Sequence, residues 1–284
     1  MASGRSPLVS RDWLAARAGD AALVRIDLRL AADGGRAAHE AAHVPSAVFS
    51  DYAADGWRQR VGDVPGLLPT EVHLSALLAR LGVTPDKHVV LIPTGASGND
   101  FAASARAYWT LKLIGHAAVS ILDGGTKGWT AAGMPVETGF REPMAAAPYP
   151  VKTGSVLRSE ADATLAAVES GTHVLVDARS ASYFAGREKA SEARAAGHIP
   201  GAISADYVQF FDAATGALKP ATELERLFTA VPAGKPIISY CNTGHTAALN
   251  WFVLSEVLGR PDVSLYDGSM TDWTQDETRP VARG

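Results

Sequence analysis

Short hydrophobic runs alternate with longer amphipathic segments along the chain. Strand-like runs at residues 89–92 and 236–240 each precede a helix-length segment with apolar residues at helical spacing, residues 101–114 and 246–258. Strands that alternate with helices at these lengths are typical of a parallel sheet covered by helices on both faces. The pattern therefore predicts an α/β protein.

The same set of motifs occurs twice, in the same order. The run at 24–29 and the run at 174–179 both end in Asp-x-Arg, and His-Val-Pro-Ser-Ala at 43–47 matches His-Ile-Pro-Gly-Ala at 198–202. An Asp-Gly pair followed by a Trp appears at 123–129 and again at 267–273. Each pair is separated by about 150 residues, which indicates a tandem duplication.

A segment rich in Pro, Ala and Gly separates the two halves. It covers residues 139–155 and contains Pro143, Pro148 and Pro150, a composition typical of a surface linker. We therefore predict one α/β domain over residues 8–138, a linker over 139–155 and a second α/β domain over 156–280.

Composition and charge narrow the function. The 284 residues are 47% hydrophobic with a net charge of −4, and no run of Lys or Arg appears, so nothing favours a nucleic-acid or membrane-surface partner. No apolar stretch reaches the roughly 20 residues that span a bilayer. The N-terminus lacks the apolar core of a secretory signal, so a cytoplasmic location is expected. The single cysteine excludes an internal disulfide and a C-x-x-C redox pair.

That cysteine, Cys241, lies where a predicted strand ends and a helix begins. Ligands gather at the carboxyl ends of parallel strands, and a helix N-terminus stabilises a thiolate. Gly244 lets the loop curl so that successive amides can face one anion. A buried structural cysteine is the alternative. The predicted anion-binding loop consists of Asn242, Thr243, Gly244, His245, Thr246 and Ala247.

The loop, together with Gly-His-Ile-Pro-Gly-Ala at 197–202 and Tyr-Asp-Gly-Ser-Met-Thr-Asp-Trp at 266–273, resembles the rhodanese family. The likeness is to its tandem-domain members, the thiosulfate and 3-mercaptopyruvate sulfurtransferases, and extends over nearly the whole chain. It implies two rhodanese-like domains, with Cys241 carrying sulfur as a persulfide. In the family the N-terminal domain lacks the cysteine, and the first-half loop at 94–100 has none here either.

The resemblance also implies the reactants. Thiosulfate is the expected sulfur donor, with 3-mercaptopyruvate as the alternative, and cyanide or a thiol is the expected acceptor. A protein acceptor is a further alternative. No metal or organic cofactor is implied, because the cysteine itself carries the sulfur.

The sequence departs from the family pattern at the substrate-binding positions. Where tandem members have a substrate-binding Arg before a Phe, this chain has Tyr183. Two readings are open for Arg187, a contact with the same anion and a solvated surface residue beside Glu188. Arg194 is a further candidate, with exposure to solvent as its alternative. We expect Arg179 to pair internally with a carboxylate. For His245, an anion contact and a helix-start residue that faces solvent are both open.

Asp267 is a further candidate, because it follows the last predicted strand and could face the same cleft as Cys241. A turn-forming Asp before Gly268 is the favoured alternative for this residue.

Three other functions fit the sequence less well. His39-Glu40-Ala41-Ala42-His43 fits the zinc-protease motif, but Pro45 ends the helix that the motif needs. A cysteine phosphatase needs an Arg six residues after its Cys, where this chain has Ala247. The non-enzymatic alternative is a sulfur-relay or binding module built on a duplicated rhodanese-like domain.

Overall fold

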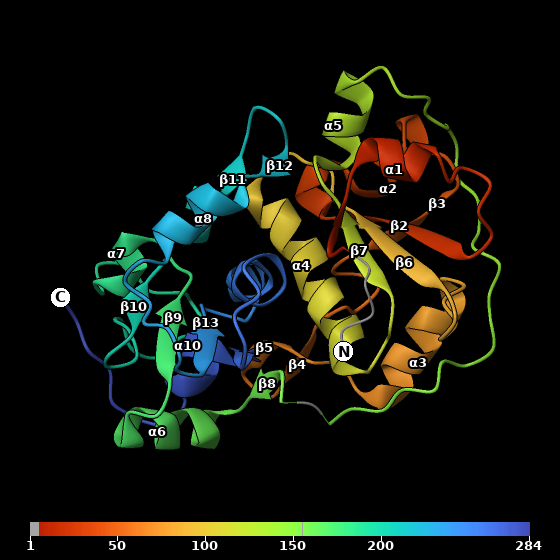
Figure 1. The fold of residues 1–284 in the computed structure, drawn as a ribbon. Coiled ribbons are helices and arrows are strands. Elements are labelled where there is room, and N and C mark those ends of the chain that lie inside the picture. Colours follow the sequence, from red (N-terminus) through yellow and green to blue (C-terminus); the bar gives the residue numbers. More distant parts are fainter. Residues whose placement is uncertain (1–5, 155) are drawn as a thin grey trace. The chain divides into compact units, whose positions relative to one another are not determined.

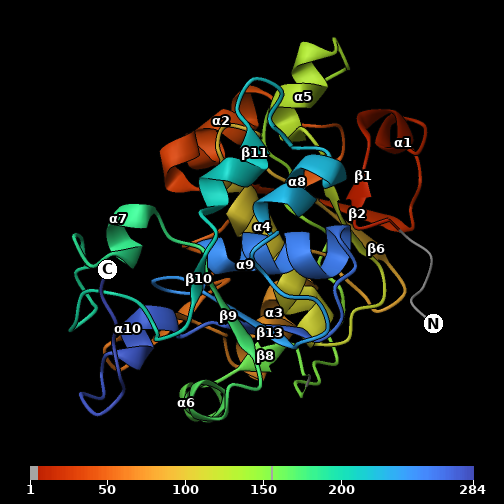
Figure 2. The same ribbon diagram turned by 60° about the vertical axis from the view of Figure 1, so that its left-hand side comes forward.

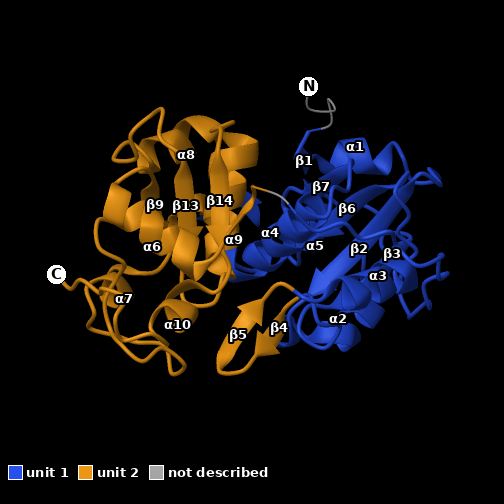
Figure 3. Ribbon diagram, turned by 90° about the horizontal axis from the view of Figure 1, so that it is seen from below, with its two compact units in different colours: residues 1–57, 69–154, 211–218 blue, residues 58–68, 155–210, 219–284 orange. Residues whose placement is uncertain are grey.

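The structure is a computed structural model that describes residues 6–154 and 156–284. Residues 1–5, which hold most of the N-terminal segment discussed above, and Ser155, the last residue of the predicted linker, lie outside the described residues. The chain forms two compact units (Figure 3), here called unit 1 (Met1–Trp57, Pro69–Gly154 and Phe211–Leu218) and unit 2 (Arg58–Leu68, Ser155–Phe210 and Lys219–Gly284). Each unit thus includes a short hairpin from the other half of the sequence. The predicted domain bounds instead place each hairpin with the half of the sequence in which it occurs.

Unit 1 is built on a five-stranded parallel sheet with the order β1-β7-β6-β2-β3. Its strands are β1 (Leu8–Val9), β2 (Leu23–Arg29), β3 (Ala47–Asp51), β6 (His88–Ile92) and β7 (Val119–Leu122). Its helices are α1 (Arg11–Ala15), α2 (Gly35–Ala41), α3 (Glu71–Arg80), α4 (Gly98–Leu113) and α5 (Gly125–Ala131). The hairpin of β11 (Phe211–Asp212) and β12 (Ala217–Leu218) completes the unit.

Local sequence explains where the longer helices of unit 1 begin. The Oγ1 atom of Thr70 accepts a hydrogen bond from the amide of His73 and caps α3, and Ser97 caps α4 in the same way. Strand β6 is buried along its whole length. Its residues Val90 and Ile92 join one core cluster with Leu14 of α1 and Trp129 of α5. Side chains alternate along a strand, so Val89 points to the other face, over which α4 runs (Figure 1).

Unit 2 has a second five-stranded parallel sheet, β10-β9-β13-β14-β8. Its strands are β8 (Arg158–Ser159), β9 (Val174–Asp177), β10 (Ile203–Ser204), β13 (Ile237–Tyr240) and β14 (Val263–Tyr266). Its helices are α6 (Ala161–Ser170), α7 (Ala181–Phe184), α8 (Ala221–Leu227), α9 (Thr246–Trp251) and α10 (Ser269–Trp273). The hairpin of β4 (Gln59–Val61) and β5 (Val64–Leu67) belongs to this unit.

The two faces of the second sheet are covered by different helices. Ser239 of β13 donates a hydrogen bond to the carbonyl of Ala247, at the start of α9. Tyr240 points to the opposite face and packs in a core cluster with Trp273 of α10 and residues of α6. Helices α9 and α6 accordingly lie on opposite sides of the sheet in Figures 1 and 2. Both the parallel sheets and the two-faced helix cover are as predicted.

One predicted helix differs in form. The segment 246–258 is α-helical only to Trp251 and continues as a π-helical stretch, Phe252–Val257. There the amide of Leu258 bonds to the carbonyl of Val253, five residues earlier. Phe252, Val253 and Leu254 of this stretch are completely buried, like the residues of α9 before them.

The two units repeat the same topology, which confirms the predicted duplication. The order β1-β7-β6-β2-β3 in unit 1 corresponds strand by strand to the order β8-β14-β13-β9-β10 in unit 2. The Asp-x-Arg pairs are buried ion pairs in both units, Asp27 with Arg29 and Asp177 with Arg179. The Nε1 atoms of Trp129 and its counterpart Trp273 each donate to the carbonyl of a proline, Pro135 and Pro280.

No helix among the described residues has the length and apolar character needed to cross a membrane.

Candidate active site

Cys241 directly follows β13, at the carboxyl end of the second sheet. Tyr240, the last residue of β13, is paired in register with Asp177, the last residue of β9. The ends of these two strands therefore lie side by side beneath the loop that leads from Cys241 to α9. The cysteine side chain is buried, with 2% of the residue exposed. This is the strand–loop–helix position predicted from the sequence.

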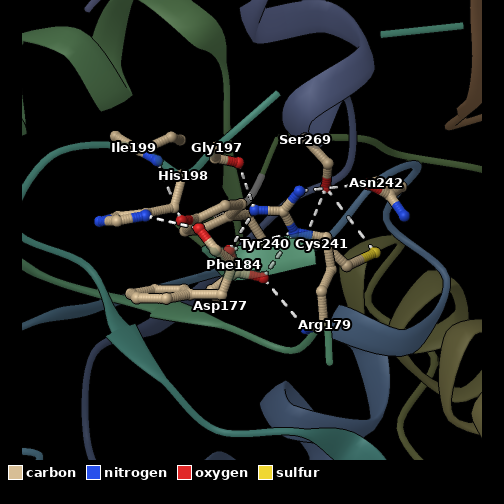
Figure 4. A network of polar contacts seen from close by, with 10 residues as sticks. All are labelled: Asp177, Arg179, Phe184, Gly197, His198, Ile199, Tyr240, Cys241, Asn242 and Ser269. Atoms are coloured by element: carbon tan, nitrogen blue, oxygen red, sulfur yellow. Dashed lines mark hydrogen bonds and ion pairs between the residues drawn. The ribbon is translucent and has the colours of Figure 1, made fainter. Parts of the chain in front are cut away.

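The hydroxyl of Ser269 holds the cysteine loop closed (Figure 4). Its Oγ atom accepts hydrogen bonds from the amide of Cys241 at 3.0 Å and from the amide of Gly244 at 3.1 Å. The hydroxyl proton is donated to the carbonyl of Tyr266 at 2.8 Å, and Oγ lies 4.0 Å from the Sγ atom of Cys241. Gly244 has a φ of +68°, so the predicted curl at this glycine is present.

Ser269 was not identified from the sequence, although a signal existed. It occupies the position of Gly125 in the first half, and both residues have nearly the same backbone, with φ of +52° and +54°. A left-handed backbone is unusual for a serine and common for a glycine. The change from Gly-Gly at 124–125 to Gly-Ser at 268–269 places a hydroxyl beside the cysteine of the second half only.

The Asp177–Arg179 ion pair braces the floor of the loop. Arg179 contacts both carboxylate oxygens of Asp177, with its shortest distance 2.6 Å, and donates to the carbonyl of Gly197. Its Nη1 atom lies 3.4 Å from the Oδ1 atom of Asn242. Burial lowers the pKa of Arg179, but the hydrogen bonds and charge of Asp177 outweigh it and the net shift is upward. The internal pairing expected for Arg179 is confirmed.

Two tyrosines lie in the same part of unit 2 as the cysteine loop. Tyr240 is fully buried, and its hydroxyl accepts a hydrogen bond from the amide of Ile199. Burial, and then the charge of Asp177, raise the pKa of Tyr240 well above its ordinary value. Burial also raises the pKa of Tyr207, with smaller contributions from Asp206 and from the nearby Cys241. Both hydroxyls therefore stay protonated near neutral pH.

The remaining loop residues are held from several sides. The carbonyl of Asn242 accepts hydrogen bonds from the amide and the Oγ1 atom of Thr271. Ala247 is buried, and Thr246 begins α9. His245 is only 9% exposed, so the interpretation of His245 as a solvent-facing residue is wrong.

The other candidate residues lie in different surroundings. Tyr183 is on α7, and Arg187 is exposed and reaches the carbonyl of Ala181 at 3.5 Å. Arg194 contacts the carbonyl of Gln275 and, at 3.8 Å, the carboxylate of Asp63. Asp267 is buried and binds the Nε atom of Arg158 and the amide of Leu68. None of these contacts joins the four residues to the cysteine loop, and their roles toward substrate stay predictions.

In the equivalent loop of unit 1, the side chain of Asp100 accepts the hydrogen bonds of two loop amides. Strand β6 is followed by Pro93, as β13 is followed by Cys241. The carbonyls of Pro93 and Cys241 accept hydrogen bonds from the second residues of corresponding helices, Thr126 of α5 and Met270 of α10. The carboxylate of Asp100 accepts hydrogen bonds from the amides of Thr94 and Gly95 at 3.0 and 2.7 Å. Burial raises the pKa of Asp100 to about 6.

The His-Glu-x-x-His motif has a structural role in unit 1. Helix α2 ends at Ala41, before His43, and the two imidazoles stack with centroids 3.9 Å apart. The Nδ1 atom of His39 bonds to Asp27 and that of His43 to the carbonyl of His39. His198 stacks in the same way on Phe184 in unit 2. Within residues 6–154 and 156–284, no three His, Cys, Asp or Glu side chains are grouped as a metal site would need.

Comparison with known proteins identifies both halves. Residues 10–132 and 160–276 match the rhodanese-like domain family. The chain is 33% identical to thiosulfate sulfurtransferase from Gallus gallus over 233 residues, which cover 81% of this chain and 78% of the relative. It is also 33% identical to 3-mercaptopyruvate sulfurtransferase from Escherichia coli strain K12 over 283 residues, 96% of each chain.

A solved structure agrees with the sequence comparison. The crystal structure of SseA from Escherichia coli, described as a 3-mercaptopyruvate sulfotransferase with the rhodanese fold, superposes with a TM-score of 0.78 at 30% identity. The match covers 94% of this chain and 100% of SseA. The chain therefore belongs to the rhodanese family, with two rhodanese-like domains in tandem.

Proposed function

We propose that the chain is a sulfurtransferase that carries sulfane sulfur as a persulfide on Cys241. The observation that supports this most directly is the placement of Cys241 at the carboxyl end of β13, in a loop whose amides converge on Ser269 Oγ. A thiolate is the nucleophilic form of cysteine, and the start of the helix that follows the loop stabilises an anion. In unit 1 the loop amides of Thr94 and Gly95 already hold a carboxylate anion.

The reaction proceeds in two displacements. In the first, the thiolate attacks the outer sulfur of thiosulfate, the S–S bond of the donor breaks, and its electron pair leaves with sulfite. In the second, cyanide or a thiolate attacks the outer sulfur of the persulfide, and the Cys241 thiolate is released. No net oxidation of the protein occurs, so neither step needs an external oxidant or reductant.

Thiosulfate is the first-choice donor and 3-mercaptopyruvate the alternative. Relatives of both names match at 33% identity, so their names do not separate the two donors. The loop residues Asn242 and Thr243 are uncharged, and His245 is the one residue among 242–247 that could carry a positive charge. A cytoplasmic location and a protein acceptor stay predictions from the sequence.

The donor is tested by measuring kcat/KM for thiosulfate and for 3-mercaptopyruvate with cyanide as the acceptor. We expect at least a tenfold preference for thiosulfate, about 1.4 kcal/mol in transition-state stabilisation. A tenfold preference for 3-mercaptopyruvate would select the alternative donor.

The role of Cys241 is tested with Cys241→Ser. We expect sulfur transfer to fall to background and the 32 Da gain of a persulfide to be absent from the intact mass after thiosulfate treatment, because the alcohol is not ionised near neutral pH. Circular dichroism serves as the control for folding. Residual enzymatic turnover above background would overturn the mechanism. Persulfide formation without turnover by the unaltered protein would favour the sulfur-relay module.

A further inference from the structure

The cysteine loop has no permanent cation, and His245 is its one residue that could become positively charged. Residues 241–247 contain no Lys or Arg, and the resemblance to tandem rhodaneses implies a substrate-binding Arg at the position that Tyr183 occupies here. Arg179 is nearby, but its guanidinium is committed to Asp177 and the carbonyl of Gly197. Arg187 is exposed and contacts the backbone of α7.

A different arginine contacts the loop directly. The Nη1 atom of Arg58 lies 3.2 Å from the Oγ1 atom of Thr243 and 3.4 Å from its carbonyl oxygen. Thr243 is two residues after the cysteine. Arg58 is half-buried and immediately precedes β4, in the hairpin that belongs to unit 2. Its positive charge is therefore held against the loop that carries the nucleophile.

The hairpin that bears Arg58 is seated closely on the loop. A Cβ atom built on Gly66 would lie 2.3 Å from the carbonyl oxygen of Thr243, so only a glycine fits there. The amide of Leu68, at the end of the hairpin, donates to the buried carboxylate of Asp267 at 2.7 Å. The hairpin is thus anchored on both sides of the loop, and Arg58 has a defined position relative to Thr243.

We propose that Arg58 binds the anionic end of the sulfur donor at the Cys241 loop. The inference rests on the proposed function and deepens it by naming the residue that takes the place of the missing family arginine. A guanidinium presents several N–H donors in one plane and matches the oxygens of a sulfonate or carboxylate. With thiosulfate, it binds the sulfonate oxygens and stabilises the sulfite that leaves as the S–S bond breaks.

The test separates the two half-reactions. In a ping-pong enzyme, kcat/KM for the donor reports the first displacement and kcat/KM for the acceptor reports the second. We expect Arg58→Ala to lower kcat/KM for thiosulfate at least tenfold, mainly through KM, and to change kcat/KM for cyanide less than twofold. Arg58→Lys should recover part of the loss, since it keeps the charge and loses the planar donor set.

Two matched controls come from the same hairpin. Arg60 is exposed and contacts the carbonyl of Asp63, so Arg60→Ala should leave both half-reactions within twofold of the unaltered enzyme. Gly66→Ala should lower the donor reaction because its methyl group displaces Thr243. Gly62→Ala carries the same left-handed backbone strain with nothing within 4 Å, and should be much milder.

Three outcomes would overturn the assignment. Donor kcat/KM within twofold of the unaltered enzyme in Arg58→Ala would exclude donor binding. An equal fall of kcat/KM in both half-reactions would make Arg58 a positioning residue for the loop. A fall of the donor kcat/KM in Arg60→Ala as large as in Arg58→Ala would likewise exclude a specific role of Arg58 in donor binding. Absence of turnover by the unaltered protein with either donor would instead contradict the proposed function, so the two failures are distinguishable.

Discussion

At the scale of single residues, the active loop depends on side chains that lie far from it in the sequence. Cys241 could be predicted because one short segment contains the strand, the cysteine, the glycine and the helix start. The repeat marks Ser269 only as the counterpart of Gly125 and does not show its contact with residue 241, 28 positions away. Arg58 could not be predicted, because its contact joins residues 185 positions apart. Sequence pattern reports local geometry, whereas these contacts exist only once the sheet and the hairpin have formed.

Two substitutions of Ser269 distinguish the effect of its hydroxyl on stability from the effect of its left-handed backbone. Ser269→Ala leaves the amides of Cys241 and Gly244 without their buried acceptor and should lower the free energy of unfolding by about 1–3 kcal/mol for each amide that stays unsatisfied. Ser269→Gly loses the same hydroxyl but relieves the left-handed backbone, so it should be about 1 kcal/mol more stable than the alanine variant. Urea unfolding measures both. Equal stabilities would contradict the strain at this residue.

The pKa of Asp100 predicts a pH-dependent stability. The folded state binds the proton of Asp100 more tightly than the unfolded state, with a pKa of about 6 against 3.8. Protonated Asp100 therefore adds to the free energy of unfolding. This stabilisation is fully present below pH 4 and is lost as the pH rises through 6. The loss is on the order of 3 kcal/mol, at about 1.4 kcal/mol per pKa unit. Urea unfolding between pH 4 and pH 7.5 should show it in the unaltered protein relative to Asp100→Asn. Parallel pH profiles for the two proteins would argue against the raised pKa.

At the scale of elements, strand ends and loops are joined by the same buried ion pair in both units. The sequence predicted the strands before these pairs, since their hydrophobic runs are short and bounded, and it predicted the internal pairing of Arg179. It did not predict the π-helical end of α9, because a periodic apolar pattern does not distinguish a bond over four residues from one over five. Nor did it predict the burial of His245, which depends on packing.

The duplicated ion pair offers a matched experiment. Asp177→Asn and Asp27→Asn each leave a buried arginine without its carboxylate, and each should lower the free energy of unfolding by about 3–5 kcal/mol. Only Asp177→Asn should also lower the turnover of the folded enzyme, because only Arg179 contacts the cysteine loop through Asn242. Thermal unfolding and steady-state kinetics below the unfolding transition test this. A similar loss of turnover in Asp27→Asn would refute the assignment to the loop.

At the scale of the whole molecule, the sequence halves and the compact units are different divisions of the chain. The motif repeat predicted two α/β domains and a Pro-rich boundary. It did not predict that β4–β5 belongs to unit 2 and β11–β12 to unit 1. In the sequence each hairpin lies between the repeated motifs of one half, so the motif order assigns the hairpin to that half. A chain cut between the halves therefore loses part of each unit.

This exchange predicts the behaviour of fragments. A fragment of residues 156–284 contains Cys241 but lacks Arg58 and the amide of Leu68 that bonds to Asp267. We expect it to have less than a tenth of the donor kcat/KM of the full chain, and to regain activity when a fragment of residues 1–154 is added. Full activity of the isolated fragment would show that the hairpin is dispensable.

The carboxylate of Asp100 bears on how the two copies could change over evolutionary time. Gaining a thiol at Pro93 would take one substitution, but the loop amides of Thr94 and Gly95 that would receive a persulfide already hold an internal anion. A second negative charge in the same pocket is repelled, so the new thiol would be inert until Asp100 was also replaced. Losing Asp100 first removes the partner of two amides and weakens the fold before any activity is gained. A single substitution at residue 93 is therefore not expected to make the first half active.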